Sequence, residues 1–416
     1  MHNFNKNHSR LLFLSLLLII GIISTSIILL ATRTFGVGLS PDSLHYLFMA
    51  KQVLIGEAIT TAVWPPMYPA ALALISLIFR ISLLNSARFL NAVSFGITIF
   101  MSGILIRKNI KLNMLFTFLG LFIIILSRPL VPVHLMAWSE PLFICMMIIS
   151  LLFLDEYFSV KNFSYLILSS VFISIACITR YIGLAVVMAA ISTIVLLNRQ
   201  NYRLLIRDVV SYLLISTTPL AVWLVRNICV TGTLTGPRSS SSHTFLEIIR
   251  AMSNAIYRFF LFGRLENNRL LIAIFFIIIG FLISTYYWKI YQIYRPDLSR
   301  NYLFIIVIGV YLVFLLSMSM LTKIDLVDNR LLSPIIVPLY LIFLGFTIEI
   351  GKIWKEKKHN ISINIFLTLF LTIFIIFSFP YTKATINNHI KNGNDFLTRP
   401  WSESIPPLYY EEFPDL

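Results

Sequence analysis

The sequence predicts an all-α protein, a polytopic bundle of transmembrane helices. Hydrophobic residues make up 58% of the 416 residues and charged residues only 12%, about half the charged share of a soluble globular domain. Apolar runs of about 20 residues, long enough to cross a bilayer, recur along the chain. Lysines and arginines are scattered at the ends of these runs, as membrane orientation requires. These features exclude a cytosolic enzyme, a disulfide-rich secreted domain and a disordered chain.

The apolar runs predict about 11 spans. They are residues 11–31, 86–106, 112–127, 139–158, 163–178, 182–198, 208–225, 271–290, 301–320, 331–349 and 361–379. The first run is long enough to span and has no small-residue cleavage site after it, so we expect a retained signal anchor. A further stretch, 68–84, is short and carries Arg80. We expect it to form a re-entrant or interfacial helix that does not cross.

The positive-inside rule gives an orientation. With the N-terminus in the cytoplasm and 68–84 not crossing, every short basic turn lies on the cytoplasmic side. The transmembrane domain is then 1–379, with outer loops at 32–85 and 226–270 and a short extracytoplasmic tail at 380–416. The net charge of +15 reflects this orientation and indicates no nucleic-acid partner. We expect a multi-pass protein of the inner (plasma) membrane.

The first outer loop carries the most informative residues. Ser40 is a favourable helix N-cap and Pro41 a favourable first helical residue, so the sequence predicts an amphipathic helix on the outer face. Asp42 lies in its first turn, where a carboxylate also simply complements the helix dipole. The run from Trp64 to Pro69 has a comparable plain interpretation, an interfacial aromatic belt.

Taken together, these residues resemble bacterial GT-C fold glycosyltransferases that use polyprenyl-phosphate sugars, the superfamily of the protein O-mannosyltransferases and aminoarabinose transferases. The matching positions are Asp42, Tyr46, Ala50, Gly56, Trp64–Pro69, Ser139–Pro141, Thr179–Gly183, Trp223, Arg226, Asn227, Gly236–Arg238, Arg330, Pro334, Pro338, Gly393, Trp401 and Ser404. Many relatives carry two adjacent acids in the first loop, whereas Ser43 follows Asp42 here. Larger relatives also have a sizeable C-terminal domain, so the short tail leaves the acceptor open.

The resemblance implies an inverting membrane enzyme that moves a sugar from a polyprenyl-phosphate donor to an acceptor hydroxyl at the extracytoplasmic face. The acceptor would be a lipid, a glycan or a protein. The implied general base is Asp42. Glu140 would position the acceptor or, with Asp42, hold a divalent cation such as Mg²⁺ or Mn²⁺, although no cofactor is certain. Arginine suits a lipid phosphate because its donors are forked. The expected substrate-binding residues are Tyr46, Tyr68, Arg180, Arg226, Arg238 and Arg330.

Several of these residues have simpler interpretations. Glu140 follows Ser139 and could be an ordinary helix-first acid, and Arg226 could mark a helix end. Arg330 could pair with a nearby acid, Asp325 or Asp328. A metal site that includes His45 and His134 is weakly supported, because the two histidines are far apart in sequence.

Two other functions stay open. An O-antigen-type polymerase or ligase also has many spans, but it usually places its chief loop late in the chain. A transporter or flippase would carry ionisable residues at mid-membrane and broken helices in two symmetric halves, and these spans are nearly free of central charges. The sequence has no GxGxxG, P-loop, HExxH or GxSxG motif, so nothing indicates a nucleotide cofactor or a serine hydrolase.

Overall fold

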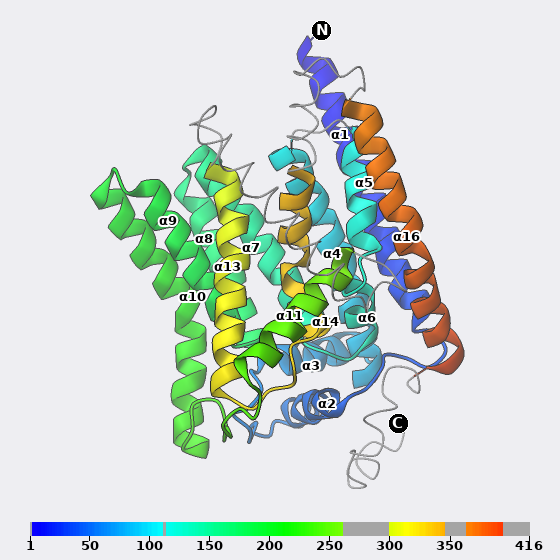
Figure 1. Cartoon of the computed structure of the whole chain (residues 1–416). Helices are drawn as coiled ribbons and strands as arrows, with labels where there is room; N and C mark the ends of the chain where they lie inside the picture. The colour runs from blue at the N-terminus through cyan, green and yellow to red at the C-terminus, as the bar shows by residue number, and fades with distance from the viewer. Residues whose placement is uncertain (1, 111–113, 261–298, 346–362, 394–416) are drawn as a thin grey trace.

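The computed structural model describes residues 2–110, 114–260, 299–345 and 363–393, which are helical apart from their connections (Figure 1). The helices are α1 (His2–Ala31), α2 (Pro41–Leu54), α3 (Met67–Phe79), α4 (Leu83–Ile110), α5 (Met114–Ile125), α6 (Leu130–Leu135), α7 (Glu140–Val160), α8 (Phe163–Thr179), α9 (Gly183–Asn198), α10 (Tyr202–Thr231), α11 (Phe245–Phe260), α13 (Ser299–Leu321), α14 (Asn329–Leu332) and α16 (Ile363–Asn392). A 3₁₀ turn, η2 (Ser333–Ile335), joins α14 to a helical segment at 336–345.

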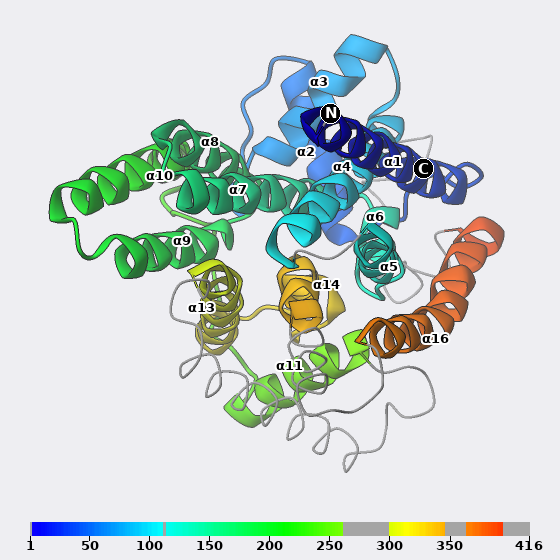
Figure 2. The same cartoon turned by 90° about the horizontal axis from the view of Figure 1, so that it is seen from above.

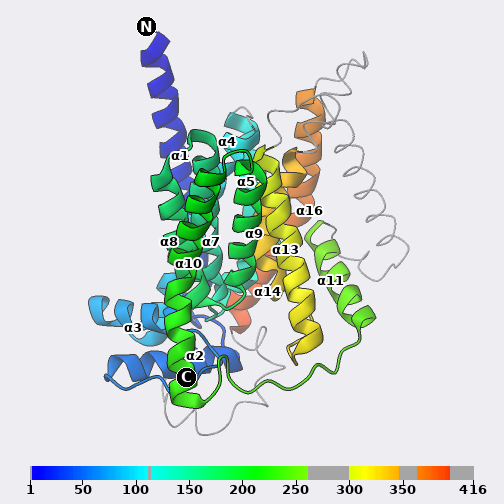
Figure 3. The same ribbon diagram turned by 90° about the vertical axis from the view of Figure 1, so that its left-hand side faces the viewer.

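The long helices run side by side, and this confirms the predicted all-α membrane bundle (Figures 1 and 3). Five of them, α1, α4, α7, α10 and α13, are long and apolar enough to cross a bilayer, and several shorter apolar helices accompany them. The chain is therefore a multi-pass membrane protein. The predicted span 271–290, parts of 112–127, 331–349 and 361–379, and residues 394–416 of the predicted tail lie outside the described residues. The count of eleven spans stays a prediction.

Helix α7 lies inside the bundle and packs against α4, α8 and α9 (Figure 2). Most of its side chains are buried. Nearby, α1 and α4 approach closely because both carry glycine at their contact. A Cβ on Gly96 would lie 2.7 Å from the carbonyl oxygen of Gly21, so only a residue without a side chain fits. Helix α7 begins with Glu140 at one end of the bundle.

Helices α2 and α3 lie across that end rather than along the long helices (Figures 1 and 3). The predicted start of α2 is confirmed. Ser40 is its N-cap, Ser43 completes a capping box with it, and Pro41 is the first helical residue. Helix α3 ends where Arg80 adopts a left-handed conformation, with φ of 53°. Thirteen residues extend only about 20 Å, so α3 is too short to cross.

Three helical regions differ from the predicted layout. The short α6 and the α11 helix within the second outer loop were not predicted. Helix α16 also continues through Pro380 to Asn392, beyond the predicted end of its span at residue 379. Contacts with the bundle hold this extension, because Thr382 donates to the Leu126 carbonyl (2.9 Å) and His389 Nε2 lies 2.9 Å from the Gly36 carbonyl oxygen.

Candidate active site

Four charged side chains meet at the end of the bundle that α2 covers. Asp42 comes from α2, Glu140 from α7, Arg180 from the C-cap of α8, and Arg330 from α14. We call these four residues the charged cluster. They are far apart in sequence, and only the packing of four segments brings them together. The sequence singled out all four, and the structure places them in direct contact.

Arg330 bridges the two carboxylates of the charged cluster. Its Nε donates to Glu140 Oε1 (2.5 Å) and its Nη2 donates to Asp42 Oδ2 (2.6 Å). The simpler interpretation, a pair with Asp325 or Asp328, does not hold. Asp328 instead caps α14 by accepting from the backbone N–H of Leu331 (3.0 Å).

Glu140 is the fully buried centre of the charged cluster, with 0% of the residue exposed. Its Oε1 atom also accepts from Arg180 Nη1 (2.5 Å), while Oε2 has no hydrogen-bond partner among the described residues. The same Arg180 nitrogen contacts the Ser139 hydroxyl (3.1 Å). Glu140 is therefore more than a helix-first acid, because it anchors two guanidinium groups at once.

Asp42 is the most accessible carboxylate of the charged cluster, with 34% of its side chain exposed. Burial on its own raises the pKa of Asp42, but the neighbouring Arg330 guanidinium, helped by Arg180, holds this pKa below its usual value of 3.8. Asp42 is thus ionised at neutral pH and partly open to solvent. An ionised carboxylate that an entering hydroxyl can reach is able to accept the proton of that hydroxyl.

The backbone around the charged cluster is tied together by the segments that precede α2 and α7. Gly38 donates to the Leu135 carbonyl (2.7 Å) and accepts from the Ala137 N–H (2.8 Å). Next to this bridge, the Trp138 indole N–H donates to the hydroxyl of Ser40, the N-cap of α2 (2.7 Å). The start of α2, and with it Asp42, is therefore held at a fixed position over α7.

Trp138 also supports the arginine directly, because the Arg330 guanidinium carbon lies 4.1 Å from the centroid of its ring. Such stacking favours a cation over an aromatic face. The sequence analysis missed Trp138 as a site residue. The available signal was its position immediately before Ser139 and Glu140, although a tryptophan at a helix start is equally typical of a membrane interface.

The two predicted tyrosines lie beside the charged cluster but are buried. The Tyr46 hydroxyl hydrogen-bonds with that of Ser139 (2.9 Å), and the Tyr46 ring meets the edge of Tyr68 at 5.2 Å between centroids. The Tyr68 hydroxyl donates to Asn91 Oδ1 (3.4 Å). In this structure both tyrosines pack against the residues around Asp42 and Glu140. Their predicted contact with substrate stays a prediction.

Arg226 and Arg238 do not join the charged cluster through any contact among the described residues. Arg226 donates to the Thr61 carbonyl (3.3 Å) and stacks on Trp223 (4.6 Å from its guanidinium carbon to the ring centroid), and Arg238 is exposed. Arg226 belongs to a second set of contacts around Tyr181, whose hydroxyl donates to the Ala62 carbonyl (2.7 Å). This set fixes the connection between α2 and α3.

The two histidines weighed as metal ligands, His45 and His134, have other contacts in the described part of the chain. No group of three or more His, Cys, Asp or Glu side chains there could hold an ion. His45 stacks on Trp64, with 4.0 Å between ring centroids, and His134 Nδ1 lies 2.7 Å from the Leu130 carbonyl oxygen. Arg330 lies between Asp42 and Glu140. A divalent cation held by these two acids stays a prediction, and no reaction step proposed below requires one.

Comparison with known proteins supports the fold. No protein-family model and no curated protein sequence matches the chain. Among solved structures, the chain is similar to ArnT from Cupriavidus metallidurans bound to undecaprenyl phosphate, with a TM-score of 0.56 and 14% identity over 94% of this chain and 79% of that one. The apo structure of the same protein gives a TM-score of 0.56 and 12% identity, over 94% and 78% of the two chains. The fold is therefore ArnT-like, of the GT-C type.

Proposed function

We propose that this chain, a multi-pass membrane protein with an ArnT-like fold, is an inverting glycosyltransferase. It would move a sugar from a polyprenyl-phosphate donor to an acceptor hydroxyl at the extracytoplasmic face. The observation that carries the proposal is the charged cluster. It offers an accessible ionised carboxylate beside two arginines at a bundle end, the chemistry that transfer from a lipid phosphate requires. The lipid bound in the similar ArnT structure supports the same donor class.

The reaction needs a proton acceptor, and we assign that role to Asp42. The acceptor hydroxyl attacks the anomeric carbon of the sugar while Asp42 takes the hydroxyl proton. The bond between that carbon and the phosphate oxygen breaks, and its electron pair stays on the leaving polyprenyl phosphate. A single displacement of this kind inverts the anomeric configuration. Partial solvent exposure allows Asp42 to reach an entering hydroxyl.

The arginines would stabilise the negative charge that grows on the leaving phosphate. Arg330 uses Nε and Nη2 for the two carboxylates, and its Nη1 makes no hydrogen bond with a described residue. Arg180 uses only Nη1 on Ser139 and Glu140. Both therefore keep N–H donors for a phosphate. Glu140 acts as a positioning residue, because its single Oε1 atom holds both guanidinium groups in place.

The predicted orientation puts the charged cluster on the extracytoplasmic side of the inner (plasma) membrane, and this placement is part of the proposal. The acceptor class, a lipid, a glycan or a protein, is left to experiment. A polymerase or ligase in the same type of pathway would also use lipid-linked sugars. The early position of Asp42, just after α1, favours the transferase over that alternative and over a transporter.

The test compares Asp42→Asn with Asp325→Asn, a matched change at an exposed acid in another outer segment. Membranes containing each full-length variant are incubated with a panel of radiolabelled polyprenyl-phosphate sugars, and labelled acceptor is quantified. Loss of a general base typically costs about 10²- to 10⁴-fold in rate. We expect that loss for Asp42→Asn at normal protein abundance, an intermediate loss for Glu140→Gln, and none for Asp325→Asn. Near-parental transfer by Asp42→Asn would refute the assignment.

A further inference from the structure

Tyr311, on helix α13, contacts the segment that carries Arg330. Its side chain is buried, with 1% of the residue exposed, and its hydroxyl donates to the backbone carbonyl of Leu331 (2.8 Å). Leu331 is the residue after Arg330 in α14. The Tyr311 hydroxyl also lies within electrostatic range of Arg180 and Glu140. A side chain outside the charged cluster is thus bonded to the backbone that carries one of its members.

This hydrogen bond holds α14 inside the bundle. Tyr311 is ten positions before Leu321, the last residue of α13, which corresponds to about 15 Å along the helix axis. The chain leaves α13 at Leu321 and returns to the level of Tyr311 at Leu331. Helix α14 has only four residues, and the last four carbonyls of an α-helix lack partners within that helix. The depth of α14 in the bundle therefore depends on contacts with neighbouring elements, and the Tyr311 hydroxyl supplies one of them.

The depth of α14 matters because the two carboxylates that Arg330 contacts belong to different elements. Glu140 is fully buried at the start of α7, whereas Asp42 is partly exposed on α2. One guanidinium group spans both, at 2.5 and 2.6 Å, so a small displacement of its backbone would break at least one contact. Ser333 donates to the Arg330 carbonyl (2.7 Å), but it moves with the same segment. Tyr311 donates from a separate helix and can therefore fix the height of that segment.

We propose that Tyr311 is a positioning residue, whose hydrogen bond to the Leu331 carbonyl holds Arg330 where it joins Asp42 to Glu140. Its effect on sugar transfer rests on the proposed function, whereas the contacts themselves do not. Without the hydroxyl, α14 can shift and Arg330 leaves Asp42 first, because an ion pair with a partly exposed acid is weaker than one with a buried acid.

Such a shift has a measurable effect on Asp42. Burial raises the pKa of Asp42, and the charge of Arg330 is the strongest of the effects that lower it. Loss of the Arg330 contact should therefore raise this pKa. Tyr311→Phe leaves unchanged the other side chains that interact with the Asp42 charge, which are Arg180, His45, Tyr46 and Trp64.

The test is Tyr311→Phe, which removes only the hydroxyl. The full-length protein in detergent is treated with a water-soluble carbodiimide from pH 4 to 7, and peptide mass spectrometry gives the modification rate of each carboxyl. Carbodiimides react with the protonated carboxyl, so Asp42 of the parent should react slowly. At the acid end of this range we expect the rate for Asp42 to rise about fivefold in Tyr311→Phe, the factor that corresponds to one net hydrogen bond.

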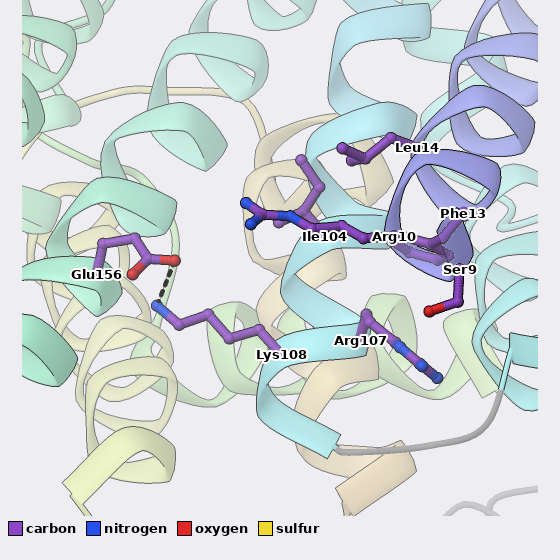
Figure 4. Close-up of a pocket in the computed structure, with 8 residues that line it drawn as sticks. All are labelled: Ser9, Arg10, Phe13, Leu14, Ile104, Arg107, Lys108 and Glu156. Carbon is purple, nitrogen blue, oxygen red and sulfur yellow. Dashed lines mark ion pairs between the residues drawn. The ribbon is translucent and has the colours of Figure 1, made fainter. Parts of the chain in front are cut away.

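The same experiment contains an internal control in Glu156, at the other end of α7. Its side chain is 30% exposed, close to the 34% of Asp42, and it pairs with Lys108 (2.9 Å; Figure 4). Its modification rate should be the same in parent and variant. The matched variant is Tyr212→Phe, which removes the same atom from an equally buried tyrosine of α10 that hydrogen-bonds with Ser169 (3.4 Å). It should leave the rate for Asp42 unchanged.

Sugar transfer gives a second readout, in a double-mutant cycle. Tyr311→Phe should lower kcat/KM for the lipid donor about fivefold in the parent, but it should have no further effect in Arg330→Gln, because Tyr311 acts through Arg330. Equal losses in both backgrounds would indicate a general structural role and would overturn the proposal.

The carbodiimide result separates this proposal from the proposed function. An unchanged rate for Asp42 in folded Tyr311→Phe, or the same increase in Tyr212→Phe, would overturn the positioning role even if the parent transfers sugar. If the parent transfers no sugar from any donor while the rate for Asp42 rises as expected, the proposed function fails and the positioning role of Tyr311 is supported.

Discussion

Replacing Arg330 tests the geometry of the charged cluster most sharply, because this side chain contacts both carboxylates. In Arg330→Lys a single ammonium cannot reproduce two bonds from a forked group, so one of the contacts at 2.5 and 2.6 Å is lost. A hydrogen bond to a charged group is worth about 1.5–3 kcal/mol. With 1.36 kcal/mol for each factor of ten, we expect kcat/KM for the lipid donor to fall about 10- to 150-fold.

Removing the positive charge of Arg330 should also shift the pH dependence of activity to higher pH. In the parent, Arg330 keeps the pKa of Asp42 below 3.8, so the base is ionised from acidic to neutral pH. In Arg330→Gln, burial of Asp42 is opposed only by the charge of Arg180 and by the side-chain hydrogen bond with Trp64, and the pKa of Asp42 rises. If Asp42 is the proposed base, transfer depends on its ionised form and declines as the pH drops through this pKa. The acid limb of the kcat/KM profile should therefore move to higher pH in the variant.

The assay is donor turnover by purified protein in detergent from pH 4 to neutrality, with solubility and melting temperature recorded for each variant. Lys323→Gln is the control, since it removes one positive charge from an exposed side chain in the segment just before Arg330, and its profile should match the parent. If Arg330→Gln is folded and its kcat/KM stays as constant as that of the parent over this pH range, Arg330 does not set the ionisation of Asp42. A kcat/KM equal to that of the parent in Arg330→Lys would show that the reaction does not need both guanidinium donors of Arg330.

Three further predictions follow from topology and packing. Cysteine-accessibility labelling of intact cells should modify a cysteine at Arg238 but not one at Lys355, which lies outside the described residues; the reverse pattern would overturn the orientation. Trp138→Phe keeps an aromatic ring beside Arg330 but loses the 2.7 Å hydrogen bond from the indole N–H to the Ser40 hydroxyl at the N-cap of α2. This bond is worth about 1 kcal/mol, so steady-state assays should show kcat/KM about fivefold lower. Gly236→Ala places a methyl group on a residue with a φ of +80° and against the Val63 side chain. It should destabilise the protein by at least about 1 kcal/mol and so lower its melting temperature. An unchanged melting temperature would contradict this packing.

Local chemistry made the elements around the site predictable. The start of α2 followed from Ser40 and Pro41, because capping depends only on neighbouring residues. The position of most long helices followed from hydropathy alone. Reliance on hydropathy also made the predicted span of α16 too short. Its polar extension beyond residue 379 is stabilised by contacts with residues just after α1 and α5, and hydropathy does not detect such contacts.

The pairing within the charged cluster was less accessible to sequence analysis. The sequence indicated that Asp42, Glu140, Arg180 and Arg330 share one face of the membrane, since each follows or precedes a span. It could not show that Arg330 forms its ion pairs with Asp42 and Glu140, which are distant in sequence, and not with Asp328, which is only two positions away. That choice depends on helix packing, which leaves Asp328 occupied as the cap of α14. Trp138 was missed because its role depends on a cation that arrives from a different helix.

The chain order of the charged cluster has a consequence for how the protein is made. Synthesis proceeds from the N-terminus, so Asp42 and Glu140 reach the membrane well before the arginine that joins them. Glu140 gains Arg180 early, whereas the ion pair of Asp42 is with Arg330. A nascent chain interrupted before residue 330 therefore carries both carboxylates without the group that unites them. The charged cluster is therefore completed only late in biogenesis.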